Sequence, residues 1–156
     1  MTKSQRSRVM SKIRGKDTRP ELAVRSVLHR MGYRFRLHRR DLPGSPDIVL
    51  PKYRAVVFVH GCFWHRHEGC SKAYTVKTDP EGRWRKKFEQ NVERDRRVRA
   101  ELRKLGWKVI VVWECRICEL GRLQQRFRRR LRLVDVMDLQ GVPESVRVFG
   151  ASEVPM

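Results

Sequence analysis

Acidic residues are scarce in this chain of 156 residues. Asp and Glu number 17 against 37 Lys and Arg, which gives a formal net charge of +20. Solubility requires far less charge than this, so the imbalance indicates a polyanionic partner. Hydrophobic residues still make up 40% of the chain. We therefore expect one folded domain with irregular ends, and not a disordered basic tail.

Long apolar runs are absent as well. No run approaches the ~20 residues that a membrane-spanning helix requires, and the basic N-terminus lacks the apolar stretch of a secretory signal. The sequence also has no internal repeat and no low-complexity block. We therefore expect a cytoplasmic protein without a membrane partner. In that reducing compartment, four cysteines favour metal ligation or reactivity over disulfide bonds.

Apolar residues at helical spacing predict three helices. The first has Thr18 and Glu21 in capping-box spacing and ends at Gly32. The second runs from residue 84 to 105 and includes Val92 among its apolar positions. The third follows a stripe of Leu120, Leu123, Phe127 and Leu131.

Alternating and continuous apolar runs predict the strands. Residues 33–38 alternate apolar and basic side chains, and a short apolar run at 47–50 follows the turn sequence LPGSP. The runs at 55–59 and 107–113 are rich in β-branched residues, as expected of buried strands. The order helix, strands, helix, strand, helix predicts an α/β fold with a mixed sheet flanked by helices.

The stretch HGCFWHRHEGC contains a dense group of possible metal ligands. Cys62, His67 and Cys70 fall within nine residues, and the segment WECRIC offers either Cys115 or Cys118 as a fourth ligand. Four thiolate or imidazole ligands suit a structural zinc site. The alternative is that these cysteines are small buried residues. The density of Cys and His favours zinc, but the spacing does not decide between the last two cysteines.

A second possible site joins two strand ends. Asp47 begins one predicted strand and His60 ends the next, so the two side chains could meet at one end of the sheet. Such a pair can hold a divalent cation and activate water. The alternative is an ordinary turn aspartate and an ordinary strand-end histidine.

Four segments in order resemble the very-short-patch repair (Vsr) DNA mismatch endonuclease family. They are PGSPDIVL, YRAVVFVHGCFWHRH, NVERDRR and LGWKVIVVWEC, and matches in this order are highly specific. The resemblance implies a restriction-endonuclease-like fold of the PD-(D/E)XK class. Pro46 and Asp47 supply the PD, and FVH at residues 58–60 replaces the (D/E)XK. It also implies Mg²⁺-dependent nicking of one strand 5′ to the thymine of a T·G mismatch left by deamination of 5-methylcytosine.

The resemblance assigns the catalytic residues one by one. Asp47 and the backbone carbonyl of Val59 would bind Mg²⁺, His65 would be the base for the attacking water, helped by Glu21, and His60 would lie near the scissile phosphate. An imidazole with a pKa near ~6.5 suits proton uptake near neutrality. Glu21 has an equally good alternative as the capping-box partner at the start of the first helix.

The family's structural zinc falls on Cys62, His67, Cys70 and Cys115, which leaves Cys118 as a spare thiol. Its DNA contacts fall on aromatic wedges in the major groove and on apolar residues of the N-terminal arm that enter the minor groove. Core packing and a solvated tail are the plainer alternatives for these residues. The implied DNA-binding residues are Met10, Ile13, Phe63, Trp64, Trp84, Lys87 and Asn91.

We expect a basic DNA-binding arm at 1–17, an endonuclease domain at 18–134 and a C-terminal tail at 135–156. The resemblance implies double-stranded DNA with a T·G mismatch as the substrate and mismatch-repair proteins as partners. It further implies a monomer that acts at the nucleoid of a bacterial cell. The alternatives are a zinc-stabilised DNA-binding module without catalysis and a nickase with another sequence specificity.

Overall fold

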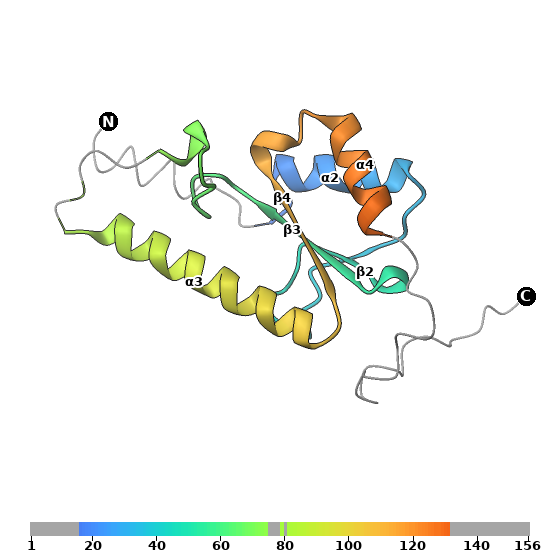
Figure 1. The fold of residues 1–156 in the computed structure, drawn as a ribbon, viewed down its shortest axis with the longest axis horizontal. Helices are drawn as coiled ribbons and strands as arrows, with labels where there is room; N and C mark the ends of the chain where they lie inside the picture. Colours follow the sequence, from blue (N-terminus) through green and yellow to red (C-terminus); the bar gives the residue numbers. More distant parts are fainter. Residues whose placement is uncertain (1–15, 75–78, 80, 132–156) are drawn as a thin grey trace, which may run out of the picture.

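The chain folds around a four-stranded sheet with helices on both faces (Figure 1). The computed structural model describes residues 16–74, 79 and 81–131. The helices are α2 (Arg19–Arg30), α3 (Arg83–Lys104) and α4 (Leu120–Arg130). The strands are β1 (Arg36–Leu37), β2 (Ile48–Leu50), β3 (Ala55–His60) and β4 (Lys108–Trp113). The predicted order of elements is confirmed.

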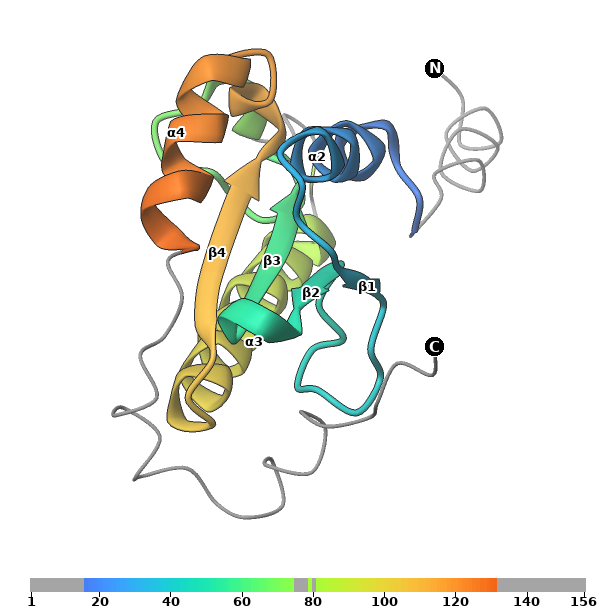
Figure 2. The same ribbon diagram turned by 90° about the vertical axis from the view of Figure 1, so that its right-hand side faces the viewer.

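The sheet is mixed, as predicted. Its strand order is β1-β2-β3-β4, which Figure 2 shows across the face of the sheet. The pairs β1–β2 and β2–β3 are antiparallel, and β3 pairs with β4 in parallel. A parallel pair requires a long crossover connection, and α3 lies within it.

The sheet separates two hydrophobic cores. Because successive strand residues point to opposite faces, Val57 packs under α2 and α4 while Val56 and Phe58 pack against α3. All positions of β3 except Val59 are buried. The prediction of a strand covered on both faces is therefore confirmed for β3.

At the start of α2, Thr18 and Glu21 form the predicted cap, except that the Glu21 carboxylate accepts from the backbone N–H of Asp17 and not of Thr18. Thr18 is the N-cap residue, and its Oγ1 accepts a hydrogen bond from the Glu21 backbone N–H at 3.4 Å. Thr18 Oγ1 also donates to Glu21 Oε1 at 2.8 Å. Gly32, with φ +81°, follows the end of the helix as predicted.

The turn before β2 requires a glycine. Gly44 has φ +70°, and a Cβ atom at this position would lie 2.4 Å from Cγ1 of Val98 on α3. Both the backbone conformation and the close approach exclude a larger side chain. This turn fixes the point at which Asp47 enters the sheet.

Several sequence predictions differ from the structure in detail. Only Arg36 and Leu37 of the expected strand at 33–38 pair with β2. The strand at 107–113 was expected to be buried, but β4 is at the rim of the described sheet and only Ile110 and Val112 are fully covered. Val92 and Leu120, expected on apolar helix faces, are 41% and 44% exposed. None of the described helices is long and apolar enough to cross a membrane.

Candidate active site and metal centre

Two stacked histidines meet an aspartate at the end of β3. His60 is the last residue of β3 and is only 6% exposed. The ring of His65, from the loop that follows, stacks on it with a centroid distance of 3.8 Å and an interplanar angle of 11°. Nδ1 of His65 lies 2.5 Å from Oδ2 of Asp95 on α3. The structure therefore builds an imidazole–carboxylate pair from two elements that are 30 residues apart.

Asp95 is the main site residue that the sequence reasoning missed. The inward face of α3 runs through Phe88, Asp95, Val98 and Leu102, while Val92 points outward. An acidic residue on the apolar stripe of a helix is unusual, because burying a carboxylate without a partner is costly. This position on the stripe was the signal that could have identified it.

Burial and neighbouring groups set the charges of His60 and Asp95. Burial, and to a smaller extent the adjacent His65, lower the pKa of His60 to about 3. Burial acts to raise the pKa of Asp95, but the hydrogen bond and charge of His65 outweigh this and lower it overall. Asp95 is therefore ionised and His60 is neutral at neutral pH.

Asp47 lies at the start of β2 and is tied to the neighbouring strand. Its Oδ2 accepts a hydrogen bond from the Val59 backbone N–H at 2.7 Å. Burial is the main cause that raises its pKa to about 6; the Val59 bond opposes this rise and the charge of Glu21 adds to it. Asp47 belongs to none of the three His, Cys and acid groups that the described residues form. A cation bound there would need further oxygen ligands from outside these groups.

Glu21 caps α2 and also faces the site. It is 4% exposed, and its Oε2 accepts hydrogen bonds from the Asp17 backbone N–H at 3.0 Å and from Arg25 Nη2 at 3.1 Å. Its charge also acts on Asp47, since it raises the pKa of that carboxyl group. The capping role is thus present in the structure. In the described structure the carboxylate hydrogen-bonded to His65 is Asp95 and not Glu21.

The predicted zinc ligands come together beside this site. Nδ1 of His67 lies 3.4 Å from Sγ of Cys62 and 3.3 Å from Sγ of Cys115, and all four donor atoms of the group with Cys70 lie within 4.8 Å of one another. Tetrahedral zinc, with Zn–S near ~2.3 Å and Zn–N near ~2.0 Å, places its ligands at comparable separations. Cys118 is exposed and outside the group. The donor set therefore fits a structural zinc ion, with Cys115 as the fourth ligand.

Trp113 connects the two sites. As the last residue of β4 it is the register partner of His60, and its ring meets the His60 ring edge-on at 5.3 Å. His67 stacks on the same indole at 4.2 Å with an angle of 8°. One histidine from each site, His67 and His60, thus packs against the same indole ring.

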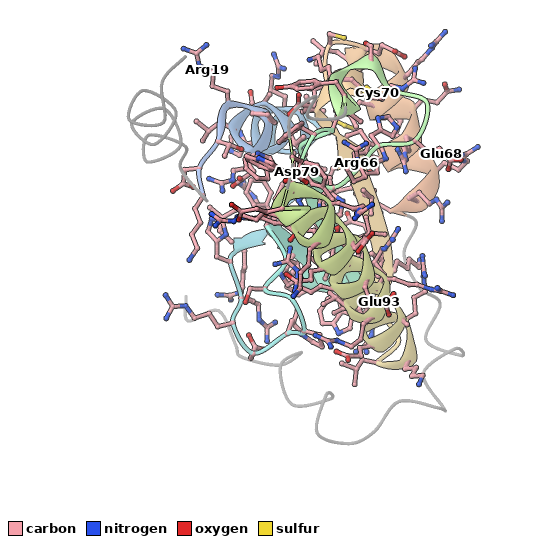
Figure 3. All side chains as sticks on the ribbon, turned by 90° about the vertical axis from the view of Figure 1, so that its left-hand side faces the viewer. Arg19, Arg66, Glu68, Cys70, Asp79 and Glu93 are labelled. Atoms are coloured by element: carbon pink, nitrogen blue, oxygen red, sulfur yellow. The ribbon has the colours of Figure 1, made fainter. Side chains whose placement is uncertain are left out.

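An aromatic cluster joins the same loop to the start of α3. Phe63 packs against each of the other rings at centroid distances between 5.0 and 5.7 Å. Figure 3 shows Arg66 and Asp79 beside the first turns of α3, and Glu93 further along the helix. The cluster consists of Phe63, Trp64, Tyr74, Trp84 and Phe88.

The predicted DNA-contact residues gather around Trp64. Lys87 Nζ lies 5.5 Å from the centre of its ring, and Asn91 Nδ2 donates to its carbonyl at 3.2 Å. The structure thus brings five predicted DNA-contact residues, from the loop and from α3, to one surface. Met10 and Ile13 lie outside the described residues.

Comparisons with known proteins give the class of enzyme. The family model described as DNA mismatch endonuclease Vsr matches residues 1–72. The Type II nicking enzyme V.XorIIP of Xanthomonas oryzae is 51% identical over 131 residues, which cover 84% of this chain and 95% of the relative. The DNA mismatch endonuclease Vsr of Escherichia coli K12 is 45% identical over 113 residues, 72% of this chain and 71% of the relative.

The sheet presents an oriented imidazole beside a half-buried carboxylate. Together with sequence identity of this extent, this site defines the protein as a DNA endonuclease. The chain belongs to the Vsr family. The resemblance carried by its four sequence segments is therefore confirmed.

Proposed function

We propose that this endonuclease nicks one strand of duplex DNA on the 5′ side of the thymine in a T·G mismatch. The observation that carries the proposal is the hydrogen bond between His65 and Asp95 close to Asp47. A module that only binds DNA has no need of an oriented base. The mismatch is proposed from the name of the Escherichia coli relative, a DNA mismatch endonuclease.

The chemistry follows from the orientation of the His65 ring. Asp95 accepts a hydrogen bond from Nδ1–H of His65, which leaves the lone pair of Nε2 available to take a proton from water. The water oxygen then attacks phosphorus, the bond to the 3′ oxygen breaks, and this oxygen takes up a proton from solvent. The products are a 3′-hydroxyl and a 5′-phosphate. Neutral His60 lies close enough to the base to contact the same phosphate group.

Two metals complete the proposal. Asp47 and the Val59 carbonyl would hold Mg²⁺, which when bound stabilises the charge of the reacting phosphate. One carboxylate is few for such a site, so phosphate oxygens of the DNA would supply the remaining ligands, in a restriction-endonuclease-like arrangement. Cys62, His67, Cys70 and Cys115 would hold structural zinc and so fix the loop that carries His65.

Mismatch selection is proposed to reside in the aromatic cluster and the arm. Phe63, Trp64 and Trp84 would wedge between base pairs from the major groove, with Lys87 and Asn91 beside them. Met10 and Ile13, in the arm at 1–17, would enter from the minor groove. A mismatch unstacks at lower cost than a Watson–Crick pair, so wedging itself favours mismatched DNA.

The sequence context of the mismatch is a separate question. The relatives from Xanthomonas oryzae and Neisseria meningitidis are both named Type II nicking enzymes. We therefore keep as the second candidate a nickase with its own sequence specificity. In either case we expect a monomer that acts on nucleoid DNA in the cytoplasm, together with mismatch-repair proteins.

The test is a single-turnover nicking assay with Mg²⁺ on duplexes that carry T·G or T·A in varied flanking sequences. We expect nicks only in T·G duplexes of certain contexts. Asp95→Asn should nick at least about 100-fold more slowly, since an oriented general base contributes about 10²–10⁴-fold. Glu93→Gln removes the same charge from an exposed position on the same helix and should nick normally.

The outcomes separate the alternatives. Equal nicking of T·G and T·A duplexes would reject mismatch selection and favour the second candidate. Near-normal nicking by Asp95→Asn would reject the assignment of His65 and Asp95 as the base pair. If the protein binds the duplexes but nicks none of them in any flanking sequence, the alternative of a DNA-binding module without catalysis would be favoured.

A further inference from the structure

The outer edge of β4 has no strand partner among the described residues. β4 is the last strand in the order of the sheet and pairs only with β3 among the strands that the structure describes. Figure 2 shows it at the rim of the sheet, opposite β1. An edge strand presents backbone N–H and C=O groups that can pair with another extended chain.

A groove of about 430 Å³ runs along this edge. Its floor is made by β4 and Trp107, with Val109, Val111 and Trp113 among the lining side chains. Its walls are four arginines, two from α3 and two from α4, and no acidic residue lines it. We call this feature the β4 groove, and its arginines are Arg99, Arg103, Arg126 and Arg130.

The arginines of the β4 groove form few ion pairs within the described residues. Arg103, Arg126 and Arg130 have no ion-pair partner there, whereas arginines elsewhere on the same helices pair with helix acids, as Arg97 does with Glu101 at 3.9 Å. Burial lowers the pKa of Arg126, and the charge of Arg130 lowers it further. Unpaired guanidinium groups in a concave site attract carboxylates, which they bind in a bidentate manner.

We propose that the β4 groove binds an acidic, extended segment of a partner protein, which adds to the outer edge of β4 as a further strand. Alternate side chains of such a segment would place carboxylates on the face of the sheet that carries α4, with Arg126 and Arg130, and apolar groups on the opposite face, with Trp107 and Val109. This inference goes beyond the proposed nicking function and does not depend on it.

Two other occupants fit less well. A second copy of the chain would bring the same four arginines against their equivalents, because a symmetric interface pairs each patch with itself. Duplex DNA offers no backbone amides to pair with a strand edge. The proposed DNA contacts also lie on the first half of α3, at Trp84, Lys87 and Asn91, while the groove uses Arg99 and Arg103 in the second half.

The experiment measures the binding of a labelled seven-residue peptide of alternating Glu and Val to the full chain by fluorescence anisotropy. A second peptide has its central valines replaced by proline, which keeps the charge but removes the backbone N–H groups that strand pairing needs. A third replaces Glu by Lys. We expect binding of the first peptide, binding at least about tenfold weaker for the proline peptide and none for the Lys peptide.

Matched protein variants locate the site. Arg103→Glu with Arg130→Glu changes one groove arginine on each helix, and Lys104→Glu with Arg128→Glu makes the same charge change at neighbouring exposed positions outside the groove. The groove variant should bind the Glu–Val peptide at least about tenfold more weakly than the control variant. Both variants should match each other in melting temperature and in T·G nicking.

Four results would overturn the proposal. The first is that the Glu–Val peptide does not bind. The second is that the proline peptide binds as tightly as the Glu–Val peptide. The third is that the groove variant and the control variant lose the same affinity for the Glu–Val peptide. The fourth is a duplex DNA affinity that falls more in the groove variant than in the control, which would make the groove a phosphate contact. Loss of nicking in wild type and variants alike would count against the proposed function and leave the peptide result standing.

Discussion

Replacing Asp47 by Asn should make the Mg²⁺-free protein more stable at neutral pH. Burial raises the pKa of this carboxyl group from 3.8 to about 6, so the folded state binds more protons than the unfolded state between these values. The stability of the wild type therefore falls as the pH rises through this window. The amide of Asn has no proton to lose, and its oxygen can still accept the bond from Val59 N–H.

The size of the effect follows from the shift. About two pKa units at about 1.4 kcal/mol each give roughly 3 kcal/mol at pH 7 as an upper value. The assay is urea unfolding, followed by circular dichroism, at several pH values in zinc-replete buffer without Mg²⁺. The gain in unfolding free energy for Asp47→Asn over wild type should be near zero below about pH 4 and reach its full size above about pH 6.

Mg²⁺ supplies the second arm of this experiment. A cation that binds the Asp47 carboxylate stabilises the folded wild type by mass action and has no such partner in Asp47→Asn. The stability difference should therefore shrink as Mg²⁺ is added, while Glu93→Gln should respond to Mg²⁺ like the wild type. A stability difference that is absent at pH 7 would refute the raised pKa of Asp47. A difference that grows with Mg²⁺ would refute the assignment of Asp47 as a metal ligand.

Three further predictions concern the zinc cluster, the aromatic wedge and the turn before β2. Cys115→Ser should lower the zinc content below one ion per chain and reduce the melting temperature, while Cys118→Ser should leave both unchanged; metal analysis and thermal melts measure this. Phe63→Ala with Trp64→Ala should lower affinity for T·G duplexes more than for matched ones at an unchanged salt slope, by about 1–3 kcal/mol per lost stacking contact. Equal losses in anisotropy titrations would exclude a wedge. Gly44→Ala should cost about 1–3 kcal/mol in urea unfolding, because its backbone is left-handed and its Cβ would clash; a neutral result would contradict this geometry.

Local patterns predicted the elements because each signal lies within one segment. The capping box at Thr18, the stripe of α4 that includes Leu123 and Phe127, and the buried run of β3 all depend on neighbours in sequence. Their order was enough to predict a mixed sheet with helices on both faces. The edge position of β4 was missed, because a run of apolar residues does not reveal how many strands lie beyond it.

The site was predicted where its residues share one loop and missed where they do not. Cys62, His67 and Cys70 are close in sequence, but the choice of Cys115 over Cys118 depends on the angle at which the chain leaves β4. Asp95 reaches His65 only because α3 crosses the sheet at a particular register. Such crossings are set by packing between distant segments, which spacing along the chain does not encode.

The cluster of Cys62, His67, Cys70 and Cys115 sets an order on the synthesis of the molecule. Three of its donors leave the ribosome together, but the fourth follows His67 by 48 residues and arrives only when β4 has been made. By then α3 has already been translated, so Asp95 is available to His65 before the cluster can close. A chain that stops before β4 can contain the whole loop that carries His65 and still lack the fourth donor of the cluster. Premature termination before Cys115 would thus yield products without the last donor of the proposed zinc site.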